Sequence, residues 1–516
     1  MTQAATLVCL VGILGLFWLD RSSRSRTSVA LWIPVAWMSI AGSRSVSQWL
    51  QASSSDPDSS PLDRIVVSSL MLVGIAVLLK RGSKVRTLLL SNLPVVVFFL
   101  YCAFSVVWSE FPVATITRWW KAVGDLVMIM IVLTDAAPIE AVGRVLSRVS
   151  FFLLPFSMLF IKYYPALGRY YDYWEGRQYY SGVSVDKNML GVSCMAFALA
   201  STWYLIDGFW DPKRERKTGS FIAHGVVVYM ALWLFVRIDS MTSLGCFMLA
   251  ASLIAAMRIP FVTQAAWIRH GLLAFVTLFT LTVLLFGLGG SILKSMGRDP
   301  TLTGRTDLWA ALSTLNPNPL FGPGFEAFWR GPRLEKIART IGHANEAHNG
   351  YFEVYLNLGW AGLTLLTLVI ALGYRNISRV IRVDPRTGRL WLAYFIAGLV
   401  YSITEAGFRV QGPMWITFLL AIIGSTATST RPNDINSNAA LPARWKGGTI
   451  DKNSSQVIRV PKWSPAAAHG NARHDQRDGA RRSSIDGAMP QEHLRRGAFR
   501  FTRSEVSADS PRKGPS

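Results

Sequence analysis

Long apolar runs alternate with short polar connections along the first 430 residues of the chain. Each run is close to the roughly 20 residues that cross a bilayer as a helix. A helix is the expected form, because lipid offers no partner for unsatisfied backbone polar groups. The alternating ten-residue pattern of a membrane barrel is absent. The pattern predicts an all-α, polytopic membrane protein with about 12–13 transmembrane helices, near residues 4–19, 28–41, 65–79, 88–108, 115–133, 141–163, 188–205, 221–237, 240–257, 271–290, 352–373, 390–405 and 412–428.

Basic residues gather in five connections that all fall on the same side of the predicted spans, namely 20–27, 80–86, 211–217, 257–270 and 374–389. Because cytoplasmic loops carry an excess of Lys and Arg, we predict that this set faces the cytoplasm and that the other set faces outward. The first apolar run lacks a basic leader and a small-residue cleavage site, which indicates a retained helix rather than a cleaved signal. If that run is not a span, twelve spans remain and both chain ends lie inside.

A polar island, residues 293–355, interrupts the apolar pattern most strongly. It holds seven Lys and Arg residues and two histidines, His343 and His348. The connection parity places it outside, so we predict one large extracytoplasmic loop, about 291–351, that carries the chemistry.

The composition changes again after the last apolar run. Residues 431–516 contain 16 Lys and Arg against 8 Asp and Glu, with Pro, Ser, Asn and Gly throughout. Such a segment buries too little apolar surface to fold alone. The sequence therefore predicts two regions: a membrane domain, 1–430, and a disordered basic cytoplasmic tail, 431–516, whose charge suits anionic lipid.

Composition agrees with this assignment. Of 516 residues, 51% are hydrophobic and 16% are charged, whereas a soluble protein carries about 25% charged residues. In a soluble chain the net charge of +22 would indicate nucleic acid, but here topology explains it and no nucleic-acid partner is expected. The four cysteines lie inside apolar runs without metal-ligand spacing. No phosphate-binding or dinucleotide motif stands in a suitable context, and no cofactor or metal is predicted.

Four outward-facing spots carry candidate binding residues, each with a structural alternative. Arg118 and Lys121 share one helical face and suit an anionic headgroup, although both could snorkel beside interfacial tryptophans. Lys187 and Asn188 follow a tyrosine-rich loop and suit phosphate and sugar, although the aromatics fit an interfacial belt.

The other two spots lie within the island. Arg305 and Trp309 follow Thr303, and Thr303 or Thr306 could cap a helix whose start would bind an anion together with Arg305. A surface ion pair of Arg305 with a neighbouring aspartate is the alternative. His348 and Asn349 open the next span, where a histidine can accept a proton at neutral pH; a structural histidine is the alternative.

The order of these motifs resembles one known family. The chain reads WS with a proline and an arginine at 108–118, KNxxG at 187–191, GRxxxW at 304–309, GPG at 322–324 and HN at 348–349. Over about 91–427 it is similar to the O-antigen ligase and polysaccharide polymerase superfamily, particularly to exopolysaccharide polymerases of rhizobial type.

The resemblance implies an inverting, metal-independent glycosyltransferase with a GT-C-like fold in the bacterial inner membrane, with its site facing the periplasm. It implies a glycan donor on undecaprenyl diphosphate, a glycan or lipid acceptor, and as partners a chain-length regulator and a flippase. Carried over residue by residue, Arg305 binds the diphosphate, His348 lies near the acceptor hydroxyl, and Lys187 and Asn188 match the KN pair. One departure matters: the family's arginine in a serine-rich stretch is missing at 239–244, which leaves Arg237 or Arg118 to compensate.

Two alternatives remain open beside a polymerase. A ligase would move the glycan to a lipid A core or a protein, and no recognised code in the loops separates it from a polymerase. A transporter of lipid-linked sugars should place its polar residues near the bilayer midplane. Here they gather in the island and at outer helix ends, and Asp125 is the main mid-span exception, which favours an enzyme.

Overall fold

We describe the chain from a computed structural model. The structure describes residues 1–21, 27–51, 60–171, 176–210, 218–261, 267, 270, 271, 274, 275, 301–340 and 346–429, with only the backbone for 301–307, 340 and 429. The described residues belong to one compact unit, Met1–Ala440. Most of the expected span at 271–290, the whole tail and His343 lie outside the described residues, so the predictions made for them stay predictions.

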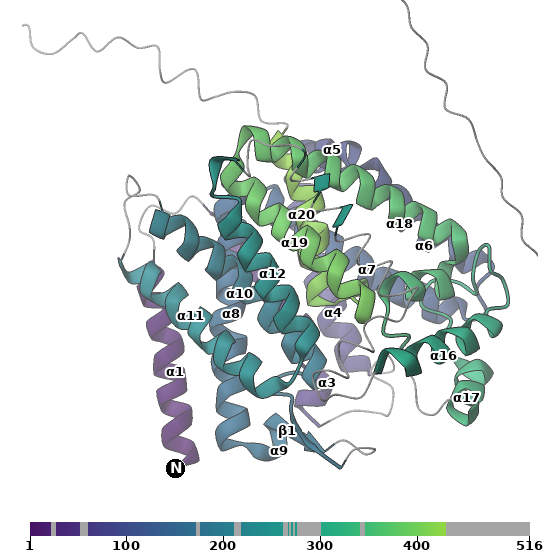
Figure 1. The fold of residues 1–516 in the computed structure, drawn as a ribbon, viewed down its shortest axis with the longest axis horizontal. Coiled ribbons are helices and arrows are strands. Elements are labelled where there is room, and N and C mark those ends of the chain that lie inside the picture. The colour runs from purple at the N-terminus through teal and green to yellow at the C-terminus, as the bar shows by residue number, and fades with distance from the viewer. Residues whose placement is uncertain are drawn as a thin grey trace, which may run out of the picture. The chain divides into compact units, whose positions relative to one another are not determined.

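Helices make up almost all of the described chain, which confirms the all-α prediction (Figure 1). The first half contains α1 Thr2–Leu19, η1 Val29–Leu31, α2 Trp32–Ala41, α3 Val46–Trp49, α4 Pro61–Leu79, α5 Gly82–Ser91, α6 Leu93–Phe104, η2 Ser105–Val107, α7 Pro112–Leu133, α8 Pro138–Tyr163 and α9 Pro165–Gly168. The second half contains α10 Lys187–Trp210, α11 Thr218–Ile238, α12 Met241–Ala256, α16 Thr301–Thr314, α17 Gly331–Thr340, α18 Gly350–Val383, α19 Pro385–Thr404 and α20 Pro413–Ser429.

Six of the described helices are long and apolar enough to cross a membrane, or up to seven if a bent pair counts as one span. They are α1, α4, α8, α10, α11 and α18, with α5 and α6 as the bent pair. The chain is therefore a multi-pass membrane protein. The predicted total of about 12–13 spans remains a prediction, because the shorter apolar helices include α12 and α20 and one expected span lies outside the described residues.

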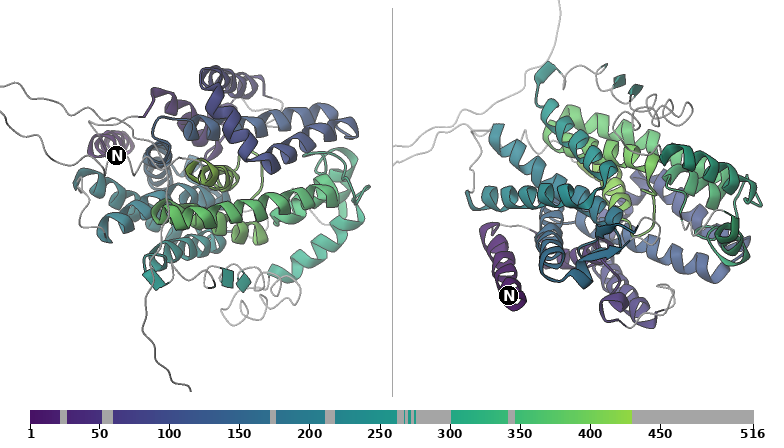
Figure 2. Two further views of the ribbon diagram at one scale, coloured as in Figure 1. Left: turned by 90° about the horizontal axis from the view of Figure 1, so that it is seen from above. Right: turned by 60° about the horizontal axis from the view of Figure 1, so that its bottom comes forward.

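The helices α10 and α19 form the centre of the bundle. The helix α10 packs against α8, α11 and α12, and α19 packs against α12, α18 and α20. Their side chains are buried almost throughout, unlike those of α1, the helix marked N in Figure 2, which packs along α8 and stays mostly exposed.

Two local features depart from the expected pattern. The single span expected at 88–108 is broken at Asn92, where α5 and α6 meet at 90°. Pro94 explains the break, because proline lacks a backbone donor and disfavours a helical residue before it. The tyrosine-rich loop, expected to be irregular, contains a short antiparallel hairpin of β1 Arg169–Tyr171 and β2 Gln178–Tyr180, in which Arg169 is opposite Tyr180.

The polar island is held to the bundle at a kink in α18. Gly359 has φ 64° and ψ −165°, a combination that is essentially restricted to glycine. The kink frees backbone donors, and Trp360 N and Ala361 N donate to Pro319 O at 2.9 Å and Leu320 O at 3.0 Å. A small apolar cluster fixes α16 and α17 beside the start of α18, through Leu308, Leu312, Phe328, Ile337, Ala347 and Leu356.

Candidate functional site

A cavity of about 650 Å³ opens where α7, α18 and α20 begin and where α6 ends. Its apolar wall comes mainly from α6 and the aromatic residues near α20, including Phe98, Phe99, Phe408 and Trp415. Its polar lining consists of three guanidinium groups and three carboxylates, from Arg118, Arg330, Arg409, Glu326, Glu346 and Glu353. A mixed lining of this kind suits a ligand with an apolar part and an anionic part.

Two motifs from distant parts of the sequence build the rim of this cavity. Gly324 lies so close to Ser109 that a Cβ on the glycine would stand 2.6 Å from the serine hydroxyl oxygen. Glu110 N donates to Pro323 O at 3.2 Å, and Thr115 Oγ1 donates to Phe325 O at 3.0 Å. The WS and GPG motifs thus form one structural unit, which sets the position of Arg118 on α7.

Glu353 and Asn357 lie one turn apart on α18, and their side chains anchor the backbone of the polar island. Glu353 accepts hydrogen bonds from Trp329 Nε1 at 2.8 Å and from Ala347 N at 2.5 Å. Asn357 accepts one from Phe328 N at 3.1 Å and donates to Glu353 O at 3.0 Å. These contacts fix the backbone on both sides of the cavity.

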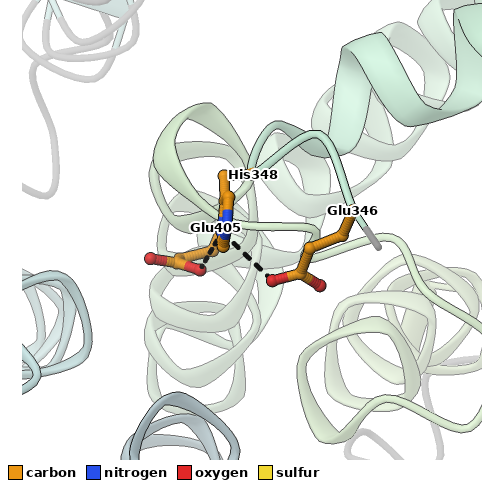
Figure 3. A group of neighbouring side chains, drawn as sticks. All are labelled: Glu346, His348 and Glu405. Atoms are coloured by element: carbon orange, nitrogen blue, oxygen red, sulfur yellow. Dashed lines mark ion pairs between the residues drawn. The ribbon is translucent and has the colours of Figure 1, made fainter. Parts of the chain in front are cut away.

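His348 lies between two carboxylates beside the cavity (Figure 3). Its Nδ1 atom is 3.1 Å from Glu346 Oε1 and 3.5 Å from Glu405 Oε2. Glu405 reaches this position because Gly350 N donates to the Glu405 carbonyl at 3.0 Å, which joins the start of α18 to the end of α19. We call Glu346, His348 and Glu405 the trio.

The two carboxylates set the charge of the imidazole. Contact with Glu346 and then with Glu405 raises the pKa of His348 to about 9, although burial acts in the opposite direction. At neutral pH the imidazole is therefore positively charged.

Arg409 joins the trio to the cavity. Its Nη1 atom donates to Glu346 Oε2 at 3.3 Å. Burial alone would lower the pKa of Arg409, but the surrounding carboxylates, Glu346 first, raise it. An anion that entered the cavity would therefore meet a guanidinium group that stays positively charged.

The structure brings together some of the predicted binding residues. Arg118 lines the cavity, with Nη1 4.0 Å from Glu326 Oε2, whereas Lys121, one turn further along α7, is half-buried and does not line it. Arg237 also lies outside the lining: it is exposed at the end of α11, 5.4 Å above the Trp233 ring. Of the two residues expected to compensate for the missing family arginine, Arg118 has the suitable place.

The KN pair opens α10 beside the trio. Asp186 caps this helix by accepting from Met189 N at 2.8 Å, and the Glu346 carboxylate helps burial to raise the pKa of Asp186. Lys187 Nζ lies 3.5 Å above the Tyr179 ring, so the hairpin holds the ammonium. Asn188 follows in the first turn of α10. Neither Lys187 nor Asn188 lines the cavity.

Trp309 and Asn349 hold the backbone on either side of His348 in place. Trp309 Nε1 donates to Ala347 O at 2.7 Å, and Asn349 Oδ1 caps α18 by accepting from Phe352 N at 2.9 Å. Arg305 lies in α16, which spans Thr301–Thr314, so the helix begins before Thr303 and Arg305 is in its second turn. The Arg305 side chain is outside the described residues, and its proposed contact with a diphosphate stays a prediction.

Sequence reasoning missed Glu405, Arg409 and Glu326 as site residues. One signal for Arg409 was available, because an arginine in a short outward-facing connection goes against the positive-inside rule. Glu405 had no such signal, since its role depends on the contact between the ends of two helices.

The trio is also the place where the described residues could hold a metal ion. One imidazole nitrogen and two carboxylate oxygens lie within 4.8 Å of one another. Such nitrogen and oxygen atoms suit zinc and related divalent cations. The proton held by His348 competes with a metal, because a ligating histidine must be neutral.

Comparison with known proteins shows which family the chain resembles. Residues 191–367 match the family model described as O-antigen ligase. The chain is also similar to the exopolysaccharide production protein ExoQ of Rhizobium meliloti (strain 1021), with 25% identity over 364 residues, which covers 66% of this chain and 78% of that protein. The resemblance predicted from the motifs is confirmed. The matched segment contains KNxxG only from its glycine, and it contains the whole island and the first half of α18.

Proposed function

We propose that this protein is a membrane glycosyltransferase that polymerises exopolysaccharide or O-antigen repeat units from an undecaprenyl-diphosphate-linked oligosaccharide. One observation carries the proposal: three guanidinium groups line a cavity directly beside a Glu–His–Glu trio. Some residues of the cavity and of the trio belong to the segment that matches the O-antigen ligase family. The similarity to an exopolysaccharide production protein favours a polymerase.

In the proposed reaction the acceptor hydroxyl oxygen attacks the anomeric carbon of the donor sugar from the face opposite the leaving group. The carbon–oxygen bond to the lipid diphosphate breaks, and its electron pair leaves with the diphosphate. Arg118, Arg330 and Arg409 line the cavity, and with Arg305 they would stabilise the charge that develops on the leaving group. The arginine side chains thus take the role that a metal ion has in other glycosyltransferases, and we propose a metal-independent mechanism.

The acceptor proton goes to the trio. A protonated imidazole has no free lone pair, whereas the carboxylate oxygens beside it are hydrogen-bond acceptors. Glu346 lines the cavity and His348 stands behind it, 3.1 Å from the Glu346 oxygen. We therefore place the proton on Glu346 in concert with His348, which keeps the histidine in the proton-accepting group predicted from the sequence.

The proposed setting is the periplasmic face of the inner membrane, with the tail in the cytoplasm. This orientation rests on the positive-inside pattern of the connections. A chain-length regulator and a flippase are the proposed protein partners, since the donor must cross the membrane before it is polymerised.

A reconstituted assay tests the function. Purified protein in lipid vesicles receives a lipid-diphosphate-linked repeat unit, and the products are sized. A ladder of products supports a polymerase, and a single transfer to a lipid A core supports a ligase. Donor movement across the bilayer without any new glycosidic bond would overturn the enzyme proposal in favour of a transporter. Loss of activity with EDTA, restored by a divalent cation, would overturn the metal-independent mechanism and assign the trio to a metal.

A further inference from the structure

A second cavity lies at the opposite end of α18. It has a volume of about 380 Å³ and is lined by three parts of the bundle: the break between α5 and α6, the last third of α18, and α20. At about 1.5 Å per residue, Arg375 stands up to about 38 Å along α18 from Gly350. The first cavity is lined by residues near the start of α18 and the second by residues near its end, so in the orientation proposed above the second cavity lies towards the cytoplasmic leaflet.

Most of the wall of this cavity is apolar, yet it contains two guanidinium groups. Arg375 and Arg379 are one turn apart on the exposed face of α18. Like charges at this spacing repel each other and destabilise a helix. Arg379 Nη1 donates to the uncharged amide oxygen of Asn376 at 2.9 Å, and the described lining includes no carboxylate. The pair therefore leaves an excess of positive charge at the end of an apolar cavity.

The break at Asn92 explains how the cavity forms. Asn92 Nδ2 donates to Leu88 O at 2.8 Å and to Thr426 Oγ1 at 2.6 Å, which ties α5 to α20. The 90° bend then carries α5 away from the direction of α6. Because α5 has Lys84 and Arg86 beside apolar residues, it has the composition of a helix that lies along a membrane surface. The cavity opens at the bend, beside residues 90–95.

We propose that this cavity binds the phosphodiester headgroup of an anionic phospholipid, with Arg375 and Arg379 on the phosphate and the acyl chains against the apolar wall. Basic pockets between transmembrane helices on the cytoplasmic side bind such headgroups, and a guanidinium group binds phosphate oxygens through two parallel hydrogen bonds. The assignment to the inner leaflet rests on the orientation proposed above, whereas the lipid contact itself does not.

Lipid binding to the purified full-length protein tests this site. Phosphatidylglycerol is added to protein in a neutral detergent, and bound lipid is counted by native mass spectrometry alongside the melting temperature. We expect tighter binding of phosphatidylglycerol than of phosphatidylcholine. Loss of two charges, each worth about 1 kcal/mol towards an anionic lipid, should weaken phosphatidylglycerol binding in the variant Arg375→Gln/Arg379→Gln by about thirtyfold.

Two further variants make the result decisive. Arg382→Gln removes a charge from the same helix outside the cavity and should bind lipid as the wild type does. Ser91→Trp keeps both arginines but fills the cavity, so it should also lose the lipid, and it serves if the double variant fails to fold. Equal binding of the two lipids, or unchanged binding in the filled cavity, overturns the proposal. Inorganic phosphate that reproduces the thermal shift alone would assign the site to a free anion and overturn the lipid.

Discussion

At the scale of single residues, the charges around His348 decide which group takes the acceptor proton. Two carboxylates within 3.5 Å keep the imidazole protonated up to about pH 9. A neutral imidazole would make up only about 1% of the population at pH 7, since each pH unit below the pKa reduces it tenfold. The sequence predicts a histidine base at this position, and its surroundings favour a carboxylate of the trio as the final acceptor.

The pH profile separates these two roles. Because His348 remains charged until its raised pKa, a carboxylate acceptor should give a kcat/KM that does not rise as the pH approaches 9 and that declines above about pH 9, as the imidazole loses its charge. A neutral-histidine base would instead give a tenfold rise per pH unit up to about pH 9. Measurement across this range with the wild type decides between them. The variant His348→Gln, which has no titrating group there, should lose the alkaline limb.

Arg305 is predicted to act on the donor rather than on the proton. Arg305→Ala should weaken binding of the lipid diphosphate and nearly abolish product, and Arg305→Lys should restore only part of the activity, because an ammonium lacks the two-pronged geometry of a guanidinium. His348→Ala should slow turnover by roughly 10²–10⁴ with donor binding retained. Donor titration and single-turnover rates measure the two effects separately. Arg339→Ala, an exposed arginine in the same polar island, is the matched control.

Single residues also mark the limit of what the sequence could predict. Arg118 and His348 stood out because they are polar, chemically competent side chains at helix ends predicted to face outward. Arg409 and Glu405 acquire their roles only through the contact of Gly350 with the end of α19, a pairing of residues 55 positions apart that no local pattern encodes. Asn349 shows the opposite case. The sequence predicts it as a binding residue beside His348, but its side-chain oxygen caps α18.

At the scale of elements, the kink of α18 connects the polar island to the bundle. An added Cβ on Gly359 would stand 2.4 Å from Leu320 C, and the glycine's φ of 64° already strains any other residue. Gly359→Ala should therefore lower stability by about 1–3 kcal/mol from backbone strain, with the clash in addition. The measurement is the apparent melting temperature in detergent together with transfer activity.

Gly225→Ala provides the control for this prediction. Gly225 lies within α11 and has nothing within 4 Å of its added Cβ. Alanine favours a helix by roughly 1 kcal/mol over glycine, so this variant should be neutral or slightly stabilised. Equal melting temperatures for the two alanine variants would contradict the role of the kink in holding the island.

Hydropathy predicted most of the described apolar helices closely, although α18 continues to Val383, well beyond the expected end at residue 373. It did not reveal how the helices are interrupted. The expected run at 88–108 is continuous in hydropathy, yet Asn92 and Pro94 divide it. The hairpin of β1 and β2 was missed for a related reason: its tyrosines fit an interfacial belt equally well, and its pairing depends on residues seven or more positions apart. Local periodicity predicts elements, while breaks and pairings depend on particular side chains.

At the scale of the whole molecule, the orientation of the bundle remains a prediction that cysteine labelling can test. In a Cys9→Ser background, Glu335→Cys in α17 should react with an impermeant reagent in intact spheroplasts, and Arg382→Cys at the end of α18 should not. Both positions are exposed, and the other three cysteines are buried. The opposite labelling pattern would reverse the orientation and move the proposed reaction to the cytoplasmic face.

The helix beside the first cavity is unusually short. The helix α6 has 12 residues and continues into the three residues of η2, so together they rise only about 22 Å, against roughly 30 Å of hydrocarbon. A bilayer adapts to such a hydrophobic mismatch by thinning next to the short segment. Outer-leaflet headgroups would then sit lower beside Phe98 and Phe99, and a carrier diphosphate could reach Arg118 without rising out of the interface. Longer acyl chains in the surrounding lipid would resist this thinning and slow the enzyme.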